Sequence, residues 1–221
     1  PDIVIELDTS QTVRDLGARV ILSVRPPIFR LASNFAHADA VIMQYDEPPW
    51  RPDFMCALLD VPGLVEITSD TVPLKGGYLA VEDQGFRLDF PPGAFKVGIC
   101  WASGKRPDQP SVFEISKQKS LDFAQFAPLA RPGVKLVSLQ QSHGDHAELR
   151  RLGVADPMQG VQDFADTAWL IDHLDLVITV DTAVAHLAGA LGKPVWNLVR
   201  YDALWPWRQE TADTCWYDSM R

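Results

Sequence analysis

Three side chains that can bind an anion or move a proton stand close together in the last quarter of the chain. Asp181 and Thr182 follow directly after the apolar, β-branched run Leu176–Val180, and His186 comes four residues later. Such a run is typical of a strand buried on both faces. The small apolar residues that follow predict a helix from 182 to 191, with Asp181 as its N-cap.

A helix that begins at the carboxyl end of a parallel strand has an N-terminus suited to anions. Its first N–H groups and its dipole both point toward that end of the sheet. The candidate ligand contacts here are Asp181, Thr182, Ala183 and His186. Two alternatives stay open, namely that Asp181 only caps the helix and that His186 is a structural histidine.

Polar side chains also follow the neighbouring strands. The run 95–100 leads to Ser103 and Lys105 on either side of a glycine, a hydroxyl and a flexible cation that suit contact with phosphate. The glycine spacing of a Walker A loop is missing. Gln140 closes the apolar run 134–140 and is a candidate for contact with a nucleotide base or ribose. The alternative for Lys105 is a solvated surface charge.

The elements that must position these residues alternate along the chain, which predicts an α/β protein with parallel sheets. We expect strands at 2–7, 18–24, 40–43, 54–59, 95–100, 134–140, 158–161, 176–180 and 194–199. We expect helices at 11–16, 28–35, 121–130, 143–152, 163–174 and 182–191, with a loop over 106–119. The segment 61–92 is rich in Gly and Pro and is expected to cross between two lobes. The tail from 201 is expected to pack back over the fold.

Composition narrows the function classes. The net charge is −9, which argues against a broad nucleic-acid surface and gives no support for binding to anionic membranes. The three cysteines are scattered, and Cys56 and Cys100 lie in apolar runs that suggest core positions. No Cys/His cluster indicates a metal site or a disulfide framework, so a reducing cytoplasm is expected. No apolar run reaches transmembrane length.

The segment from Asp181 to Val195, D-T-x-x-x-H-L-A-x-A-L-G-K-P-V, resembles the nucleotide-sugar site of the GT-B glycosyltransferases related to bacterial heptosyltransferases, glycosyltransferase family 9. The preceding DFADTAWLIDHLD (163–175) and the later WPWR and DTCWYDSMR fit the branch often attached to tetratricopeptide repeats. The resemblance covers the C-terminal part of the chain well and the N-terminal part loosely.

That resemblance implies a GT-B-like fold of two Rossmann-like lobes, with the N-terminal lobe reduced or truncated. Residues 1–92 would then be the acceptor-side lobe with its linker, and residues 93–221 the nucleotide-sugar-binding lobe. Similar proteins carry a basic residue where Lys119 stands, just before Ser120, which makes Lys119 a candidate donor contact or else a surface charge. The implied reaction transfers a sugar from a nucleotide-diphosphate sugar with inversion and without a metal or a separate cofactor. The acceptor, whether glycan, lipid-linked or protein, is open.

The resemblance is weakest at the catalytic base. Heptosyltransferase-like enzymes use an Asp in the first N-terminal loop, near a glycine-containing turn. Asp8 ends the first expected strand, but no Gly-Asp turn follows it. Asp8 is therefore the candidate base, and a non-catalytic nucleotide-sugar-binding or interaction module with a degenerate GT-B fold is the alternative. A sugar-nucleotide epimerase is a third reading, for which we identify no acidic and histidine pair between the lobes.

Overall fold

The protein is an α/β protein with two parallel sheets, as the alternation predicts, and this arrangement is consistent with a Rossmann-like fold of the GT-B type. The computed structural model describes residues 9–73, 75–86, 88–104, 110–141, 146–202, 207 and 211–221. The predicted strand 2–7 and Asp8 lie outside the described residues, as does Lys105.

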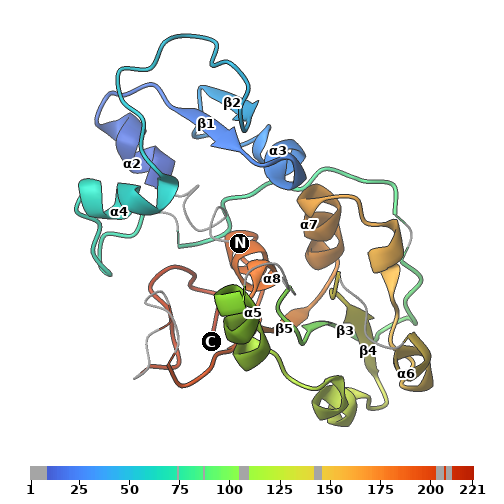
Figure 1. Cartoon of the computed structure of the whole chain (residues 1–221). Helices are drawn as coiled ribbons and strands as arrows, with labels where there is room; N and C mark the ends of the chain where they lie inside the picture. Colours follow the sequence, from blue (N-terminus) through green and yellow to red (C-terminus); the bar gives the residue numbers. More distant parts are fainter. Residues whose placement is uncertain are drawn as a thin grey trace.

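The N-terminal part holds a two-stranded sheet. Strand β1 (Ile21–Val24) pairs with β2 (Ala40–Met43) in parallel, and the helices α2 (Thr9–Asp15) and α3 (Pro26–Ala32) flank it. Its core is a small cluster of buried residues, Leu22, Val24, Ile28, Ala32 and Phe35. Figure 1 shows this blue region beside α7 (Phe164–Asp172), which belongs to the C-terminal part.

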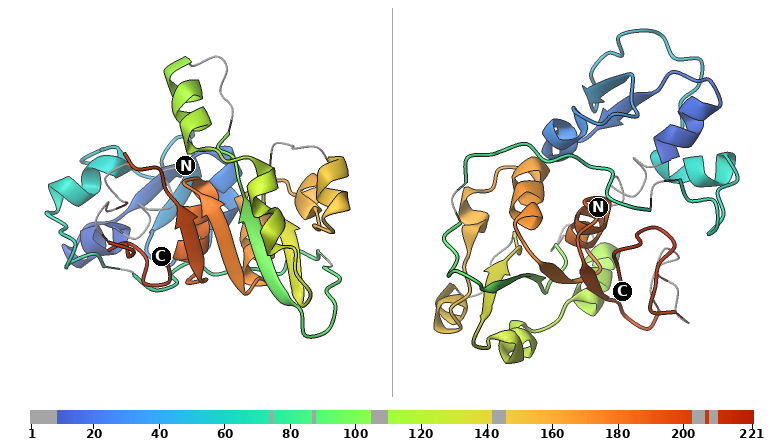
Figure 2. Two further views of the ribbon diagram at one scale, coloured as in Figure 1. Left: turned by 90° about the horizontal axis from the view of Figure 1, so that it is seen from below. Right: turned by 180° about the vertical axis from the view of Figure 1, so that it is seen from behind.

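The C-terminal part is built on a four-stranded sheet in the order β4-β3-β5-β6, and every pair is parallel. Its strands are β3 (Phe95–Cys100), β4 (Val134–Ser138), β5 (Leu176–Val180) and β6 (Val195–Leu198). Because all four run the same way, their carboxyl ends meet at one edge of the sheet, which we call the carboxyl edge. In the left panel of Figure 2 the strands lie side by side and α5 (Pro110–Lys119) projects beyond them.

Apolar layers cover both faces of this sheet. On one face lie α7 and α8 (Ala183–Ala190), together with the buried tail residues Trp216, Tyr217 and Met220. On the other face η2 (Phe123–Leu129) and α6 (His146–Arg151) pack on a second cluster. The expectation that the tail packs back over the fold is confirmed, because backbone hydrogen bonds join residues 219–221 to β6 as well.

Four of the expected elements differ from the structure. Residues 54–59 form no strand; an irregular stretch leads to the short helices η1 (Leu58–Asp60) and α4 (Val61–Leu64), and Phe54 and Cys56 are exposed. The prolines just before this run disfavour strand pairing and account for the difference. Residues 158–161 fall in a 3-10 helix, η3 (Pro157–Gly160), because Pro157 suits the first turn of a helix.

The third correction matters for the site, because the expected loop 106–119 contains α5. Pro110 stands at the first position of this helix, and Lys117 and Lys119 lie in its last turn. Both features are helix signals, since proline suits the start of a helix and cations suit its C-terminal dipole. The expected helix 121–130 is instead the 3-10 helix η2, with Pro128 inside it.

The segment that connects the two parts runs against the C-terminal core. Tyr78 and Leu79 donate backbone N–H bonds to the carbonyl of Ala190, and a Cβ at Gly77 would lie 2.9 Å from the Leu191 carbonyl oxygen. Gly192, with φ of +70°, ends α8 at this contact as expected. The connection is therefore packed on the fold rather than looped out from it.

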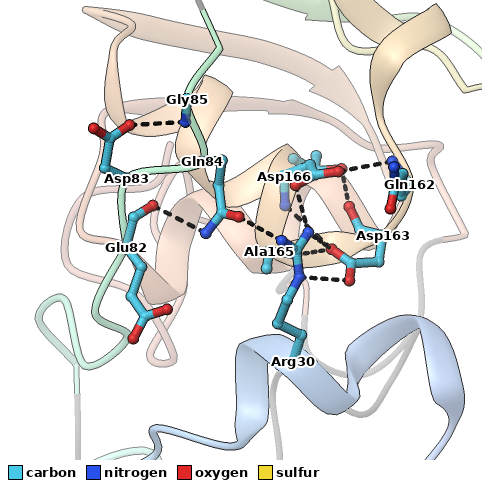
Figure 3. A network of polar contacts seen from close by, with 10 residues as sticks. Arg30, Glu82, Asp83, Gln84, Gly85, Gln162, Asp163, Ala165 and Asp166 are labelled. Atoms are coloured by element: carbon cyan, nitrogen blue, oxygen red, sulfur yellow. Dashed lines mark hydrogen bonds and ion pairs between the residues drawn. The ribbon is translucent and has the colours of Figure 1, made fainter.

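Arg30 of α3 fastens the N-terminal part to α7 (Figure 3). Its guanidinium bonds the carboxylate of Asp163 at 2.6 and 2.8 Å and also the carboxylate of Asp166 and the side chain of Gln84. Asp163 is the predicted N-cap of α7 and accepts bonds from the N–H groups of Ala165 and Asp166. Burial opposes the charge on Asp163, but the bonds from Arg30 and the helix backbone outweigh it and lower its pKa.

No helix in the portion of the chain that the structure describes is long and apolar enough to cross a membrane.

Gly189→Ala is predicted to destabilise the protein, because a Cβ there would lie 2.5 Å from the ring of Tyr217. The clash outweighs the better helix propensity of alanine, and we expect a loss of about 1–3 kcal/mol in the free energy of unfolding. Gly63→Ala in α4 is the control, since its Cβ would meet nothing within 4 Å. Denaturant unfolding that ranks the two variants equally would contradict this packing.

Arg30→Ala, in the last turn of α3, is predicted to cost more stability than Arg25→Ala at the N-cap of the same helix. Asp166 is only 4% exposed, so removal of Arg30 leaves a buried carboxylate short of a partner. Arg30 itself is 43% exposed, which limits the loss to about 1–2 kcal/mol. Arg25 is exposed and makes no such contact within the described residues. Equal unfolding midpoints for the two variants would show that the contacts of Arg30 with Asp163 and Asp166 contribute nothing to stability.

Candidate functional site

An ion pair between Asp181 and Lys119 stands at the centre of the carboxyl edge. Asp181 follows β5, Lys119 is the last residue of α5, and Lys119 Nζ lies 2.6 Å from Asp181 Oδ2. The two side chains are 14% and 9% exposed, so the charges are largely removed from water. The prediction that Asp181 caps α8 is wrong, because Thr182 is the N-cap and the Asp181 carboxylate turns to the lysine instead.

The N-terminus of α8 opens at this ion pair. Thr182 makes no side-chain bond to the helix backbone; its hydroxyl lies 3.2 Å from the hydroxyl of Thr179 and 3.8 Å from the sulfur of Cys100. Ala183 is the first helical residue and is partly buried. Because the N-cap side chain is engaged elsewhere, the first N–H groups of α8 remain suited to an anionic ligand.

The turn after β3 is tied to the end of α5. The N–H of Ser103 donates to the hydroxyl of Ser120 at 3.0 Å, and that hydroxyl donates to the carbonyl of Ser116. Ser103 is thereby held at the C-terminal end of α5, where Lys119 stands, and its predicted contact with phosphate stays a prediction. Lys105 lies outside the described residues.

The side chain of Gln140 is used by the protein itself. Its Oε1 accepts bonds from the N–H groups of Trp101 and Ala102, and its Nε2 donates to the carbonyl of Ala102. The residue is buried, so it braces the turn after β3 against the end of β4. Its predicted contact with a base or ribose would require these bonds to open, and it stays a prediction.

His186 is buried between the sheet and the tail. Its ring stacks on Trp207 with centroids 4.8 Å apart, and its Nδ1 lies 3.3 Å from the hydroxyl of Tyr217. Burial lowers its pKa to about 3, with Asp181 opposing and Lys119 reinforcing the shift. The imidazole is therefore neutral at physiological pH. These contacts give His186 a structural role, and its contact with a ligand stays a prediction.

Three residues that contact this edge or its neighbours, Arg200, Gln118 and Trp207, were not among the candidates for ligand contact. Arg200, two residues after β6, donates from Nη1 to Oε1 of Gln118 on α5 at 2.6 Å. Gln118 was missed because a loop was expected over 106–119. Pro110, followed by an uninterrupted run of polar and apolar residues, was nevertheless a usable helix signal. The stacking of Trp207 on His186 had no sequence signal, since the two are far apart in the chain.

A cavity of about 740 Å³ lies at the opposite edge of the sheet. Its lining includes Lys96 at the start of β3, Trp169 of α7 and Phe86 of the connecting segment. The candidate residues of the carboxyl edge do not line it. Within the described residues no group of three or more His, Cys, Asp or Glu side chains is placed to hold a metal ion.

The buried imidazole predicts a specific loss of stability in acid. His186 has a pKa near 6.5 when unfolded and about 3 when folded, so the unfolded chain binds its proton first. The stability that comes from keeping His186 neutral is fully present above pH 6.5 and is lost as the pH falls toward 3. The free energy of unfolding should be about 2 kcal/mol lower at pH 5 than at pH 8.

Unfolding free energies measured between pH 8 and pH 5 test this assignment. His186→Gln should be less stable at pH 8 but should lose about 2 kcal/mol less than the wild type on going to pH 5. His37→Gln is the control, because His37 lies in the N-terminal part, away from the contacts of His186 with Trp207 and Tyr217. Parallel curves for His186→Gln and wild type would contradict a neutral buried imidazole.

Comparison with known proteins supports one resemblance. Residues 147–202, which include α7, β5, α8 and β6, match the model of glycosyltransferase family 9 (heptosyltransferase). No curated protein and no solved structure is significantly similar to the chain. The matched segment contains Asp181, Thr182, Ala183, His186 and Arg200, whereas Lys119 and Ser103 precede it. Over this segment the chain is similar to the glycosyltransferases of family 9.

Proposed function

We propose that the protein is a glycosyltransferase that takes a sugar from a nucleotide-diphosphate sugar and transfers it to an acceptor. The observation that carries the proposal is the largely buried Lys119–Asp181 pair at the open N-terminus of α8. The family match over residues 147–202 supports the reaction class.

In this proposal the carboxyl edge holds the diphosphate of the donor. The ammonium of Lys119 and the first N–H groups of α8 would supply positive potential, and the hydroxyl of Ser103 would donate a hydrogen bond to a phosphate oxygen. Thr182 and Ala183 lie where the backbone meets the phosphates, and Lys105 would add a second cation. The same groups would stabilise the diphosphate as it leaves the sugar. Gln140 fixes the turn after β3 through its hydrogen bonds, and His186 packs α8 against Trp207 and Tyr217.

The reaction we propose inverts the anomeric carbon and needs no metal ion or separate cofactor, since the sugar nucleotide is itself the substrate. Residues 93–221 would form the donor lobe and residues 1–92 the acceptor-side lobe with its linker, in a cytoplasmic protein. The acceptor hydroxyl needs a base, for which Asp8 is the proposed residue. The branch associated with tetratricopeptide repeats remains part of the proposal.

One observation favours a second function, a nucleotide-sugar-binding module without turnover. Asp181 is paired with Lys119, and Asp163 and Asp166 with Arg30, so each of these described carboxylates has a cationic partner. A general base must instead be able to take up a proton near neutral pH. The module keeps the donor site and lacks the transfer step.

Calorimetric titration with UDP-, GDP-, ADP-, CMP- and dTDP-sugars tests the donor site. We expect one nucleotide class to bind, and Lys119→Gln to weaken that binding by roughly tenfold or more, about 1.4 kcal/mol. Lys135→Gln in β4 is the matched control, because it removes the same charge from the amino-terminal half of a strand. Folded protein that binds none of these donors would refute the proposal.

Release of the nucleotide separates the two functions. The protein is incubated with the donor that binds and a mixture of glycan, lipid-linked and peptide acceptors, and nucleoside diphosphate is quantified over time. An enzyme releases it, and Asp8→Asn should slow that release by a large factor. A module returns the sugar nucleotide intact.

A further inference from the structure

A second cation reaches the carboxyl edge from β6. In the pairing of β5 with β6, Val180 lies opposite Leu198, so Asp181–Thr182 and Val199–Arg200 leave the sheet side by side. Arg200 then extends to α5 and donates from Nη1 to Oε1 of Gln118 at 2.6 Å. This places its guanidinium at the helix end that also carries Lys119.

The last turn of α5 is held at the carboxyl edge by two contacts, a hydrogen bond from a guanidinium to an amide oxygen and an ion pair. Gln118 accepts from Arg200 after β6, and the next residue, Lys119, donates to Asp181 after β5. Each contact joins one cation to one oxygen acceptor across the edge. Both cations are mostly buried, with side chains 18% and 14% exposed, so part of the cost of removing them from water is already met in the free protein.

Apart from Gln118, the described partner of the Arg200 guanidinium is the exposed carboxylate of Asp202. The Nε of Arg200 is buried and makes no hydrogen bond within the described residues, although Oδ1 of Asp202 lies 3.2 Å away. A guanidinium carries five N–H donors in a planar fork that matches two phosphate oxygens. An amide oxygen such as that of Gln118 carries no net charge, so a phosphate competes with it favourably for the guanidinium.

We propose that Arg200 is a phosphate ligand of this site, which binds the diphosphate of the nucleotide together with Lys119. The inference rests on the proposed function. Gln118 and Asp181 hold the two cations in position in the free protein, and the phosphate oxygens replace them as acceptors. The ligand class is a nucleoside diphosphate, and a nucleoside without phosphate gains nothing from Arg200.

Calorimetry with a nucleoside, its monophosphate and its diphosphate tests this assignment, with the base chosen as the one that the wild type binds. Arg200→Gln should weaken the binding of the diphosphate by roughly tenfold or more and leave the affinity for the nucleoside unchanged. Arg200→Lys keeps the charge but loses the planar pair of donors. Its affinity for the diphosphate should lie between those of the wild type and Arg200→Gln. Arg151→Gln is the matched control, since Arg151 is 72% exposed and pairs only with Glu148 on its own helix among the described residues.

Gln118→Ala separates a ligand from a residue that merely positions α5. If Arg200 acts only by holding the helix, Gln118→Ala breaks the same contact and should weaken the diphosphate as much as Arg200→Gln does. If Arg200 binds phosphate, Gln118→Ala removes a competing acceptor and should leave the affinity equal to or above that of the wild type. Unfolding midpoints of all variants establish that the binding changes are not losses of fold.

The outcomes distinguish this inference from the proposed function. Diphosphate binding that depends on Lys119 but not on Arg200 overturns the inference and leaves the proposed function standing. Equal weakening by Gln118→Ala and Arg200→Gln also overturns it, because Arg200 would then be a positioning residue. Folded wild type that binds no nucleotide overturns both.

Discussion

The Lys119–Asp181 ion pair is the interaction on which the arrangement of the carboxyl edge depends. Four parallel strands bring their ends together, and this pair joins the centre of that edge to α5 through two largely buried charges. A buried ion pair is weak evidence for stability, because desolvation offsets much of its attraction. The pair does hold the Lys119 ammonium group at the start of α8 before any ligand arrives. The cation is therefore already positioned for an anionic ligand.

The N-terminal part is attached to the C-terminal part by contacts of two kinds. Arg30 reaches the N-terminal turn of α7, and the connecting segment packs along α8 through Gly77 and Tyr78. A two-stranded sheet is marginal by itself, so the small cluster around Val24 gains from being held against the larger body. Polar and apolar contacts together therefore set how the two parts lie.

The sequence predicted those features that depend on neighbours in the chain. The unit from β5 to β6 was predictable because an apolar run, small helical residues and Gly192 are local signals. The partners of its side chains were not: Asp181 pairs with Lys119, and His186 stacks on Trp207, through contacts that only the folded chain creates. Ser103, Lys119 and Asp181 meet at the carboxyl edge, but their contact with a ligand stays a prediction, and Arg200 was not among the candidates.

The most direct measurement is a crystal structure of the protein with a bound nucleoside diphosphate. The account predicts phosphate oxygens at the N-terminus of α8, with Lys119 Nζ in hydrogen-bonding distance of one of them and its 2.6 Å contact with Asp181 lengthened. A nucleotide seated instead in the cavity beside Trp169, with the Lys119–Asp181 pair unchanged, would contradict it.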